Sequence, residues 1–202
     1  MNPNRTRASN RAARIITEVF QPPVVVTAQL LISPAIDPGF PGTTWYGAIA
    51  ALFVCIIPLA LVLLLVKLGK VSDHHVSNRK QRAPVLLMAV LMLVAGLLVL
   101  NAINAPQSVI VMVLAIVAGI LVLAAVSPFW KISGHASAIS SSVVITVLML
   151  GTWWVPLLLL IPAVGWSRVV LRAHTPAQVI AGSLFGGIVM AGVWWLLRHW
   201  MP

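Results

Sequence analysis

The chain alternates between long runs of apolar residues and short polar segments. A helix needs roughly 20 apolar residues to cross the hydrocarbon core of a bilayer, with a tolerated range of about 17–25. Four nearly uncharged runs meet this requirement: residues 45–66, 84–100, 109–126 and 179–197. The pattern predicts an all-α fold, a polytopic transmembrane helical bundle.

The number of helices depends on two further apolar regions. Residues 22–36 are short and begin with two prolines, and the amphipathic stretch 14–20 before them is suited to lie along the membrane interface. Residues 136–166 are too long for one comfortable span. Their middle, GTWWVP at 151–156, combines helix-breaking Gly and Pro with a Trp pair typical of the headgroup level. We therefore interpret residues 136–166 as a hairpin and predict six or seven helices, depending on whether residues 22–36 cross.

The composition excludes a soluble globular fold and most acid chemistry. Hydrophobic residues make up 60% of the chain and charged residues 8%, against roughly 25% charged in soluble domains. The three acids, Glu18, Asp37 and Asp73, lie far apart, which excludes a carboxylate-caged metal site or a catalytic carboxylate pair. We expect no metal and no cofactor. The net charge of +10 on so apolar a chain favours anionic lipids or an anionic ligand over nucleic acid.

Three polar clusters remain between the predicted spans, at residues 67–82, 131–135 and 167–174. In the seven-helix interpretation an even number of crossings separates each from the next, so all three meet on one membrane face. Such a face is suited to phosphoryl transfer from a lipid, which needs cations, a nucleophile and an acid. His135 and His174 can act as acid and nucleophile.

The cations and a helix start complete this interpretation. Arg79, Arg82 and Arg168 can bind phosphate, because the planar fork of Arg holds phosphate oxygens two at a time. Ser133 and Gly134 precede an apolar helix, where a cap and a small residue leave backbone N–H groups free to meet the phosphate.

These residues also carry a family resemblance. The string SGH at residues 133–135, and the string SR at 167–168 followed after five residues by His174, resemble two signature motifs of the type 2 phosphatidic acid phosphatase and vanadium haloperoxidase superfamily. Those motifs read Pro-Ser-Gly-His and Ser-Arg-x5-His-x3-Asp. The resemblance implies an acid-phosphatase-like helical core. It also implies that His174 is a nucleophile forming a phosphohistidine, His135 the general acid and Arg168 a phosphate ligand.

The sequence departs from the family pattern at several positions. Ile132 stands where the second motif has Pro, and Gln178 stands where the third has the Asp that orients the nucleophilic His. A Gln carbonyl can still accept the ring N–H, but it adds no negative charge. The upstream motif, Lys-x6-Arg-Pro, is degenerate. Arg79 and Arg82 are therefore assigned as phosphate ligands on their charge and place, with Lys70 as a further candidate.

Counting the cations predicts an orientation. We divide the chain into a basic amphipathic segment, residues 1–21, and a single transmembrane domain, residues 22–202. With seven helices, 12 of the 13 Lys and Arg residues lie on the face of the polar clusters and Arg198 lies alone on the other. If residues 22–36 do not cross, the counts become 8 and 5. Because cytoplasmic loops carry the excess, we predict a multi-pass protein of the cell membrane with its active site on the cytoplasmic face.

The predicted function is that of a metal-independent membrane lipid phosphatase. Its substrate would be a phosphate monoester or diphosphate such as phosphatidic acid, phosphatidylglycerophosphate or a polyprenyl (di)phosphate. Two alternatives stay open: a weak or inactive homologue that binds or transports a lipid phosphate, and a transferase that uses an acceptor other than water. The expected partners are the lipid phosphate and the bilayer, with no nucleic acid, and the oligomeric state is left open.

Overall fold

The structure is a computed structural model that describes residues 3–36, 38–40, 42–72, 79–126 and 129–201, without the side chains of 3–6, 79–80, 82–83 and 86. This part of the chain is helical and contains no strand. The α-helices are α1 (Pro3–Val19), α2 (Pro22–Ile32), α3 (Thr44–Ala51), α4 (Ile57–Lys67), α5 (Arg79–Ala102), α6 (Gln107–Val126), α7 (Gly134–Leu150), α8 (Leu160–Val170), α9 (Pro176–Leu184) and α10 (Ala191–Trp200). The 3-10 helices η1 (Ser33–Ala35) and η3 (Thr152–Leu159) and the π-helical turns η2 (Leu52–Ile56) and η4 (Phe185–Met190) complete or connect them.

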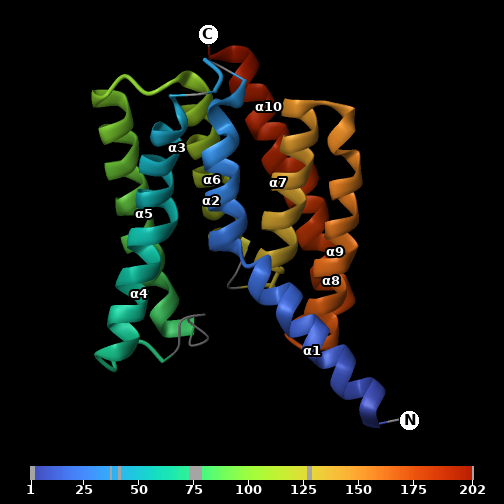
Figure 1. The fold of residues 1–202 in the computed structure, drawn as a ribbon. Coiled ribbons are helices and arrows are strands. Elements are labelled where there is room, and N and C mark those ends of the chain that lie inside the picture. The colour runs from blue at the N-terminus through green and yellow to red at the C-terminus, as the bar shows by residue number, and fades with distance from the viewer. Residues whose placement is uncertain (1–2, 37, 41, 73–78, 127–128, 202) are drawn as a thin grey trace.

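The helices run up and down a common axis, with α1 across the lower end (Figure 1). The chain rises through α2, descends through α3 and α4, rises through α5, descends through α6 and rises through α7. It then descends through η3 and α8 and rises through α9 and α10 to the C-terminus. The polar segments after α4, α6 and α8 therefore share the lower end of the bundle.

Four continuous helical segments are long and apolar enough to cross a membrane: Thr44–Lys67, Gln107–Val126, Thr152–Val170 and Pro176–Trp200. Residues Arg7–Val19 and Pro22–Ala35 form a pair bent by 42°, which makes five if the pair is one span. The described bundle thus supports a helical, membrane-like fold with four or five such helices, not six or seven. Within the described residues, the apolar helical stretches Leu87–Ala102 and Gly134–Leu150 are shorter than these four segments.

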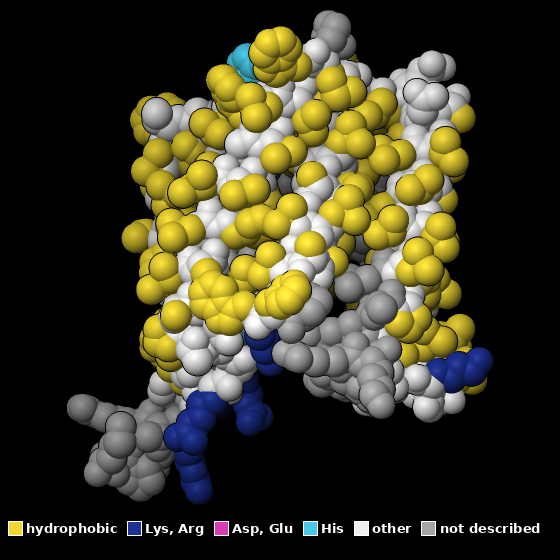
Figure 2. All heavy atoms as spheres, turned by 180° about the vertical axis from the view of Figure 1, so that it is seen from behind, with side chains coloured by type: hydrophobic (Ala, Val, Ile, Leu, Met, Phe, Trp, Pro, Cys, Tyr) yellow, Lys and Arg dark blue, Asp and Glu magenta, His cyan; other side chains and the backbone are white. Residues whose placement is uncertain are grey.

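The surface of the bundle agrees with a membrane environment. Figure 2 shows hydrophobic side chains over the middle of one face and Lys and Arg side chains at its lower end. Large apolar side chains are exposed along the helices, for example Leu98 of α5 and Ile188 of η4. Exposed apolar surface on this scale is typical of contact with lipid rather than with water.

The hairpin predicted at residues 136–166 is confirmed, but its turn is shorter than predicted. Helix α7 ends at Leu150, and Gly151 reverses the chain with a φ of 92°, a conformation that glycine adopts without a Cβ penalty. Trp153 and Pro156 already belong to the descending segment η3. The Trp153 side chain is 93% exposed at the upper end, where a headgroup-level Trp is expected.

Helix α7 packs against α2, α8, α9 and η4. Small residues allow the close approach of α9 and η4. A Cβ on Gly182 would lie 2.6 Å from the Ser133 carbonyl oxygen, and one on Gly186 would clash with the Ser137 carbonyl. The Ser140 hydroxyl donates to the Ser183 carbonyl at 2.7 Å. Small residues and buried hydroxyls thus hold α7 against the last helical segment.

Candidate functional site

The first turn of α7 begins the site. Ser133 is fully buried and caps the helix, its Oγ accepting from the Ala136 N–H at 3.4 Å. Among the described residues, nothing beyond its own chain neighbours and helix backbone lies within 4 Å of the place where a Cβ on Gly134 would stand, so the helix start borders open space. His135 follows, buried in the first turn. The positive end of the α7 dipole therefore lies beside this open space, next to a buried histidine.

The end of α8 supplies the cation. Arg168 is half-buried in the last turn, and its Nη1 donates to the Thr17 Oγ1 at 3.4 Å. Its Nε is buried and has no hydrogen-bond partner among the described residues. A buried donor without a partner costs about 1–3 kcal/mol. A phosphate oxygen is the kind of acceptor that would satisfy it.

The loop after α8 turns His174 back toward the start of α7. The N–H groups of Ala173 and His174 both donate to the Arg168 carbonyl, at 3.0 and 3.3 Å, and Arg172 adopts a positive φ of 52°. The His174 Nδ1 lies 3.3 Å from the Lys131 carbonyl oxygen. A carbonyl only accepts hydrogen bonds, so in neutral His174 this contact places the proton on Nδ1 and leaves the lone pair on Nε2.

The surroundings of His174 favour this neutral form. Burial lowers the pKa of His174 most, and the positive charges of Arg168 and Lys131 lower it further. The hydrogen bonds to the Lys131 carbonyl and the Gln178 side chain act in the opposite direction without cancelling the shift. With a pKa below the ordinary histidine value, His174 is a free base at neutral pH and can act as a nucleophile.

Gln178 ties the starts of two helices together. It forms a capping box on α9, with its N–H donating to the Thr175 Oγ1 at 3.3 Å and its Oε1 accepting from the Thr175 N–H at 3.1 Å. Its carbonyl accepts from the Ser133 N–H at 3.2 Å. The Gln178 side chain also forms a hydrogen bond with His174, the residue that Gln178 is predicted to orient.

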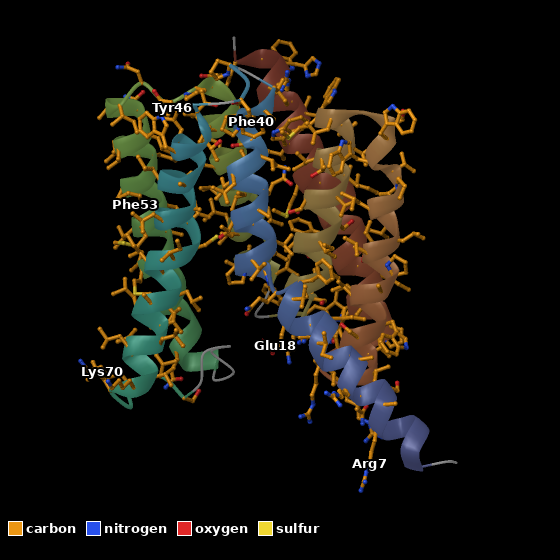
Figure 3. The ribbon with its side chains drawn as sticks, viewed as in Figure 1. Arg7, Glu18, Phe40, Tyr46, Phe53 and Lys70 are labelled. Carbon is orange, nitrogen blue, oxygen red and sulfur yellow. The ribbon has the colours of Figure 1, made fainter. Side chains whose placement is uncertain are left out.

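The structure brings the second and third clusters together but does not bring Lys70 to them. His174 contacts the Lys131 carbonyl, and Gln178 contacts Ser133. In Figure 3 Lys70 lies at the lower end of α4, on the opposite side of the bundle from the site helices α8 and α9 of Figure 1. Arg79 and Arg82 begin α5, and their side chains lie outside the description.

Two contributions to the site are absent from the sequence prediction. One is the Lys131 carbonyl, a backbone group that no residue pattern marks. The other is Thr17, whose hydroxyl receives the Arg168 bond from a helix 151 residues away. Thr17 lies four residues after Ala13 and three before Phe20, a spacing that places it on the buried face of the amphipathic helix. This spacing in the sequence could have indicated that Thr17 points inward.

The described residues contain no group of three or more His, Cys, Asp or Glu side chains able to hold a metal ion. The charged side chains near His174 are instead cationic, Arg168 and Lys131. This arrangement is suited to binding an anion beside a neutral imidazole.

Residues 124–202 match a family model described as the PAP2 superfamily. The matched region contains His135, Arg168 and His174 together with the loop that carries Lys131. No curated protein and no solved structure matches the chain.

Proposed function

Residues 124–202 match the model of the PAP2 superfamily, and from this premise we propose that the protein is a membrane phosphatase that hydrolyses a phosphate ester of a lipid. The observation that carries the proposal is the contact of the His174 Nδ1 with the Lys131 carbonyl. In neutral His174 this contact leaves the Nε2 lone pair free, and the positive charge of Arg168 acts on the same imidazole.

The proposed first step is attack of the His174 Nε2 on phosphorus. A P–N bond forms, the bond between phosphorus and the lipid oxygen breaks, and protonated His135 gives its proton to the departing oxygen. In the second step neutral His135 takes a proton from water, whose oxygen attacks phosphorus. The P–N bond then breaks, which frees phosphate and restores His174.

The phosphate charge would be held by Arg168, by the backbone N–H group of Gly134, and by Arg79 and Arg82, because the Ser133 N–H already donates to the Gln178 carbonyl. The unpartnered Nε of Arg168 and the open space at Gly134 support the first two. These donors stabilise the transferring phosphoryl group electrostatically, so the proposed reaction is metal-independent.

An apolar cavity supports a lipid as the substrate. It has a volume of about 310 Å³ and is lined by residues of α2, η2, α4, α5, α6 and α7. Gly134 and Ser137, in the first turn of α7, line its wall, so the cavity adjoins the proposed phosphate site. We propose that it receives an alkyl chain of the substrate, as in phosphatidic acid, phosphatidylglycerophosphate or a polyprenyl (di)phosphate.

We further propose that this end of the bundle faces the cytoplasm of a cell membrane that the chain crosses several times. Arg7 and Lys70 lie at the lower end (Figure 3), whereas Arg198 lies in the last turn of α10, which ends at the opposite end (Figure 1). An excess of Lys and Arg is typical of cytoplasmic loops.

A second candidate is a protein that binds or transports a lipid phosphate without hydrolysing it. The Gln178 Oε1 is already engaged by the Thr175 N–H and adds no negative charge to stabilise an imidazolium. The same pocket and cations would then serve for recognition alone.

Phosphate release by the purified protein, measured over a panel of lipid phosphates with and without a chelator, tests the proposal. We expect release from at least one lipid phosphate, unchanged by the chelator and inhibited by orthovanadate. Lipid-phosphate binding with no release from any substrate would favour the second candidate.

A further inference from the structure

Helix α1 packs on the site although it lies outside the region that matches the family. One face of α1 carries Ala13 and Thr17, both buried, and Ile16 and Phe20 join the apolar cluster around Val164 of α8. Its opposite face exposes basic residues, namely Arg7, Arg11 and Arg14. Figure 1 shows α1 running across the lower end of α8.

The hydrogen bonds between α1 and α8 have a definite direction. The Ser167 hydroxyl donates its one proton to the Val164 carbonyl at 2.7 Å, so it can only accept from Thr17. The Thr17 hydroxyl therefore donates to the Ser167 Oγ, 3.1 Å away, and accepts from the Arg168 Nη1 at 3.4 Å. The bonds form one chain from Arg168 through Thr17 and Ser167 to the α8 backbone.

This chain restrains the Arg168 guanidinium. The hydrogen bond from Nη1 to the Thr17 hydroxyl of α1 restricts rotation of the guanidinium plane. The Nε–H, which has no partner among the described residues, therefore keeps a fixed direction. The carboxylate of Glu18, next to Thr17, attracts the same guanidinium. A cation that is already oriented loses less entropy when it binds a phosphate.

We propose that Thr17 is a positioning residue for Arg168, so that the N-terminal helix completes the phosphate site. This inference rests on the proposed function for its kinetic consequence. Its geometric part, the coupling of Thr17 to anion binding by Arg168, can be measured without turnover.

The variants Thr17→Val, Thr17→Ser and Thr146→Val form the test. Valine keeps the shape of threonine and removes the hydroxyl, whereas serine keeps the hydroxyl. Thr146 is also buried and hydrogen-bonded, but to Gln29 of α2, so its variant is a matched control for losing a hydroxyl inside the bundle. Each would be purified as the full chain and assayed for lipid-phosphate hydrolysis and for orthovanadate affinity by calorimetry.

We expect Thr17→Val to lower kcat/KM and to weaken orthovanadate binding about tenfold, as losing a hydrogen bond to a charged group does. Thr17→Ser and Thr146→Val should stay within about twofold of wild type. In an Arg168→Ala background, Thr17→Val should have no further effect on orthovanadate affinity, because the two residues act as one unit.

Three results would overturn the inference: wild-type affinity in Thr17→Val, equal losses in Thr17→Val and Thr17→Ser, or a full further loss in the Arg168→Ala background. If Thr17→Val does not fold, Ser167→Ala serves instead, since it removes the acceptor of the Thr17 hydroxyl and leaves α1 intact. An unchanged orthovanadate affinity in that variant would count equally against the inference. Failure of the wild type to hydrolyse any lipid phosphate would overturn the proposed function alone.

Discussion

The Nδ1 atom of His174 lies 3.3 Å from the main-chain carbonyl oxygen of Lys131, 43 residues earlier in the chain. The family motif uses an Asp at the position of Gln178 to accept this ring N–H. Here a neutral backbone oxygen accepts it, so the tautomer is set without a negative charge. The consequences of having a neutral acceptor in place of a carboxylate can be tested by mutating the two histidines and Gln178 and by measuring how the rate depends on pH.

Replacing the two histidines should separate their roles. We expect His174→Ala to abolish hydrolysis of every substrate, because no nucleophile remains. His135→Ala should lower the rate of lipid-phosphate hydrolysis about 100-fold or more. The rate with p-nitrophenyl phosphate should fall much less, because its leaving group needs no proton. Phosphate release from both substrates checks this, with melting curves as the control for folding. Full activity of His174→Ala would contradict the mechanism.

Restoring the acid at position 178 should raise the rate of a slow enzyme. We expect Gln178→Asp to increase kcat several-fold, because a carboxylate stabilises the imidazolium that forms during the cycle. Gln178→Glu keeps the length of the capping side chain and serves as the matched variant. Steady-state kinetics of both check the prediction. No hydrolysis by wild type or either variant, with lipid phosphate still bound, would support the binding protein instead.

The rate should depend on pH through His174. Neutral His174 attacks, so kcat/KM should rise with pH as its imidazolium loses a proton. Burial and the charges of Arg168 and Lys131 lower its pKa, which puts this rise below the ordinary histidine range. Lys131→Gln removes a charge and keeps the carbonyl, so the rise should move to higher pH. Lys67→Gln, at the exposed end of α4, should leave the pH profile unchanged.

Orientation in the membrane can be read by cysteine labelling. Cys55 is buried, and a Cys55→Ser background would accept single cysteines at Lys70, Phe40 and Trp153, all of them exposed. We expect Lys70→Cys to react only after the cytoplasmic side is opened to an impermeant reagent. Phe40→Cys and Trp153→Cys, at the opposite end, should react from outside. The reverse pattern would contradict the cytoplasmic site.

Gly186 and Gly192 differ in how much space surrounds the methyl group that a mutation to alanine would add. A Cβ on Gly186 would clash with the Ser137 carbonyl, whereas one on Gly192 would meet no other described residue within 4 Å outside its own turn of helix. We expect Gly186→Ala to destabilise the fold by about 1–3 kcal/mol. Gly192→Ala, in helix α10, should be neutral or stabilise it by up to about 1 kcal/mol. Thermal melting in detergent distinguishes them, and equal melting temperatures would contradict the close packing of η4 on α7.

Apolar patterning predicts the long helices well because their length is set by the bilayer. The run at 109–126 corresponds to α6 (Gln107–Val126), and the run at 45–66 to the segment Thr44–Lys67. Apolar patterning does not predict the type of helix or the length of a turn at a particular residue. The 3-10 helix η3 follows directly from the positive φ at Gly151, where six residues of turn were expected.

The candidate site, too, was predicted from the sequence only in part. Motif spacing predicts His135, Arg168 and His174 as site residues, and the structure places the first turn of α7, the last turn of α8 and the loop after α8 at one end of the bundle. Spacing cannot reveal partners that are backbone atoms or lie on a distant helix, as the Lys131 carbonyl and Thr17 do. Their contacts depend on how α1 and the loop before α7 pack, and packing is a property of the tertiary structure.

The position of the apolar cavity has a consequence for the end of the reaction. It lies inside the bundle, whereas His174 lies in a loop at the end of the bundle. In the proposed reaction the dephosphorylated lipid would diffuse away sideways into the bilayer, and inorganic phosphate would dissolve in the aqueous phase. The two products would thus separate into different solvents, which disfavours their recombination and drives hydrolysis forward without any energy source besides the substrate.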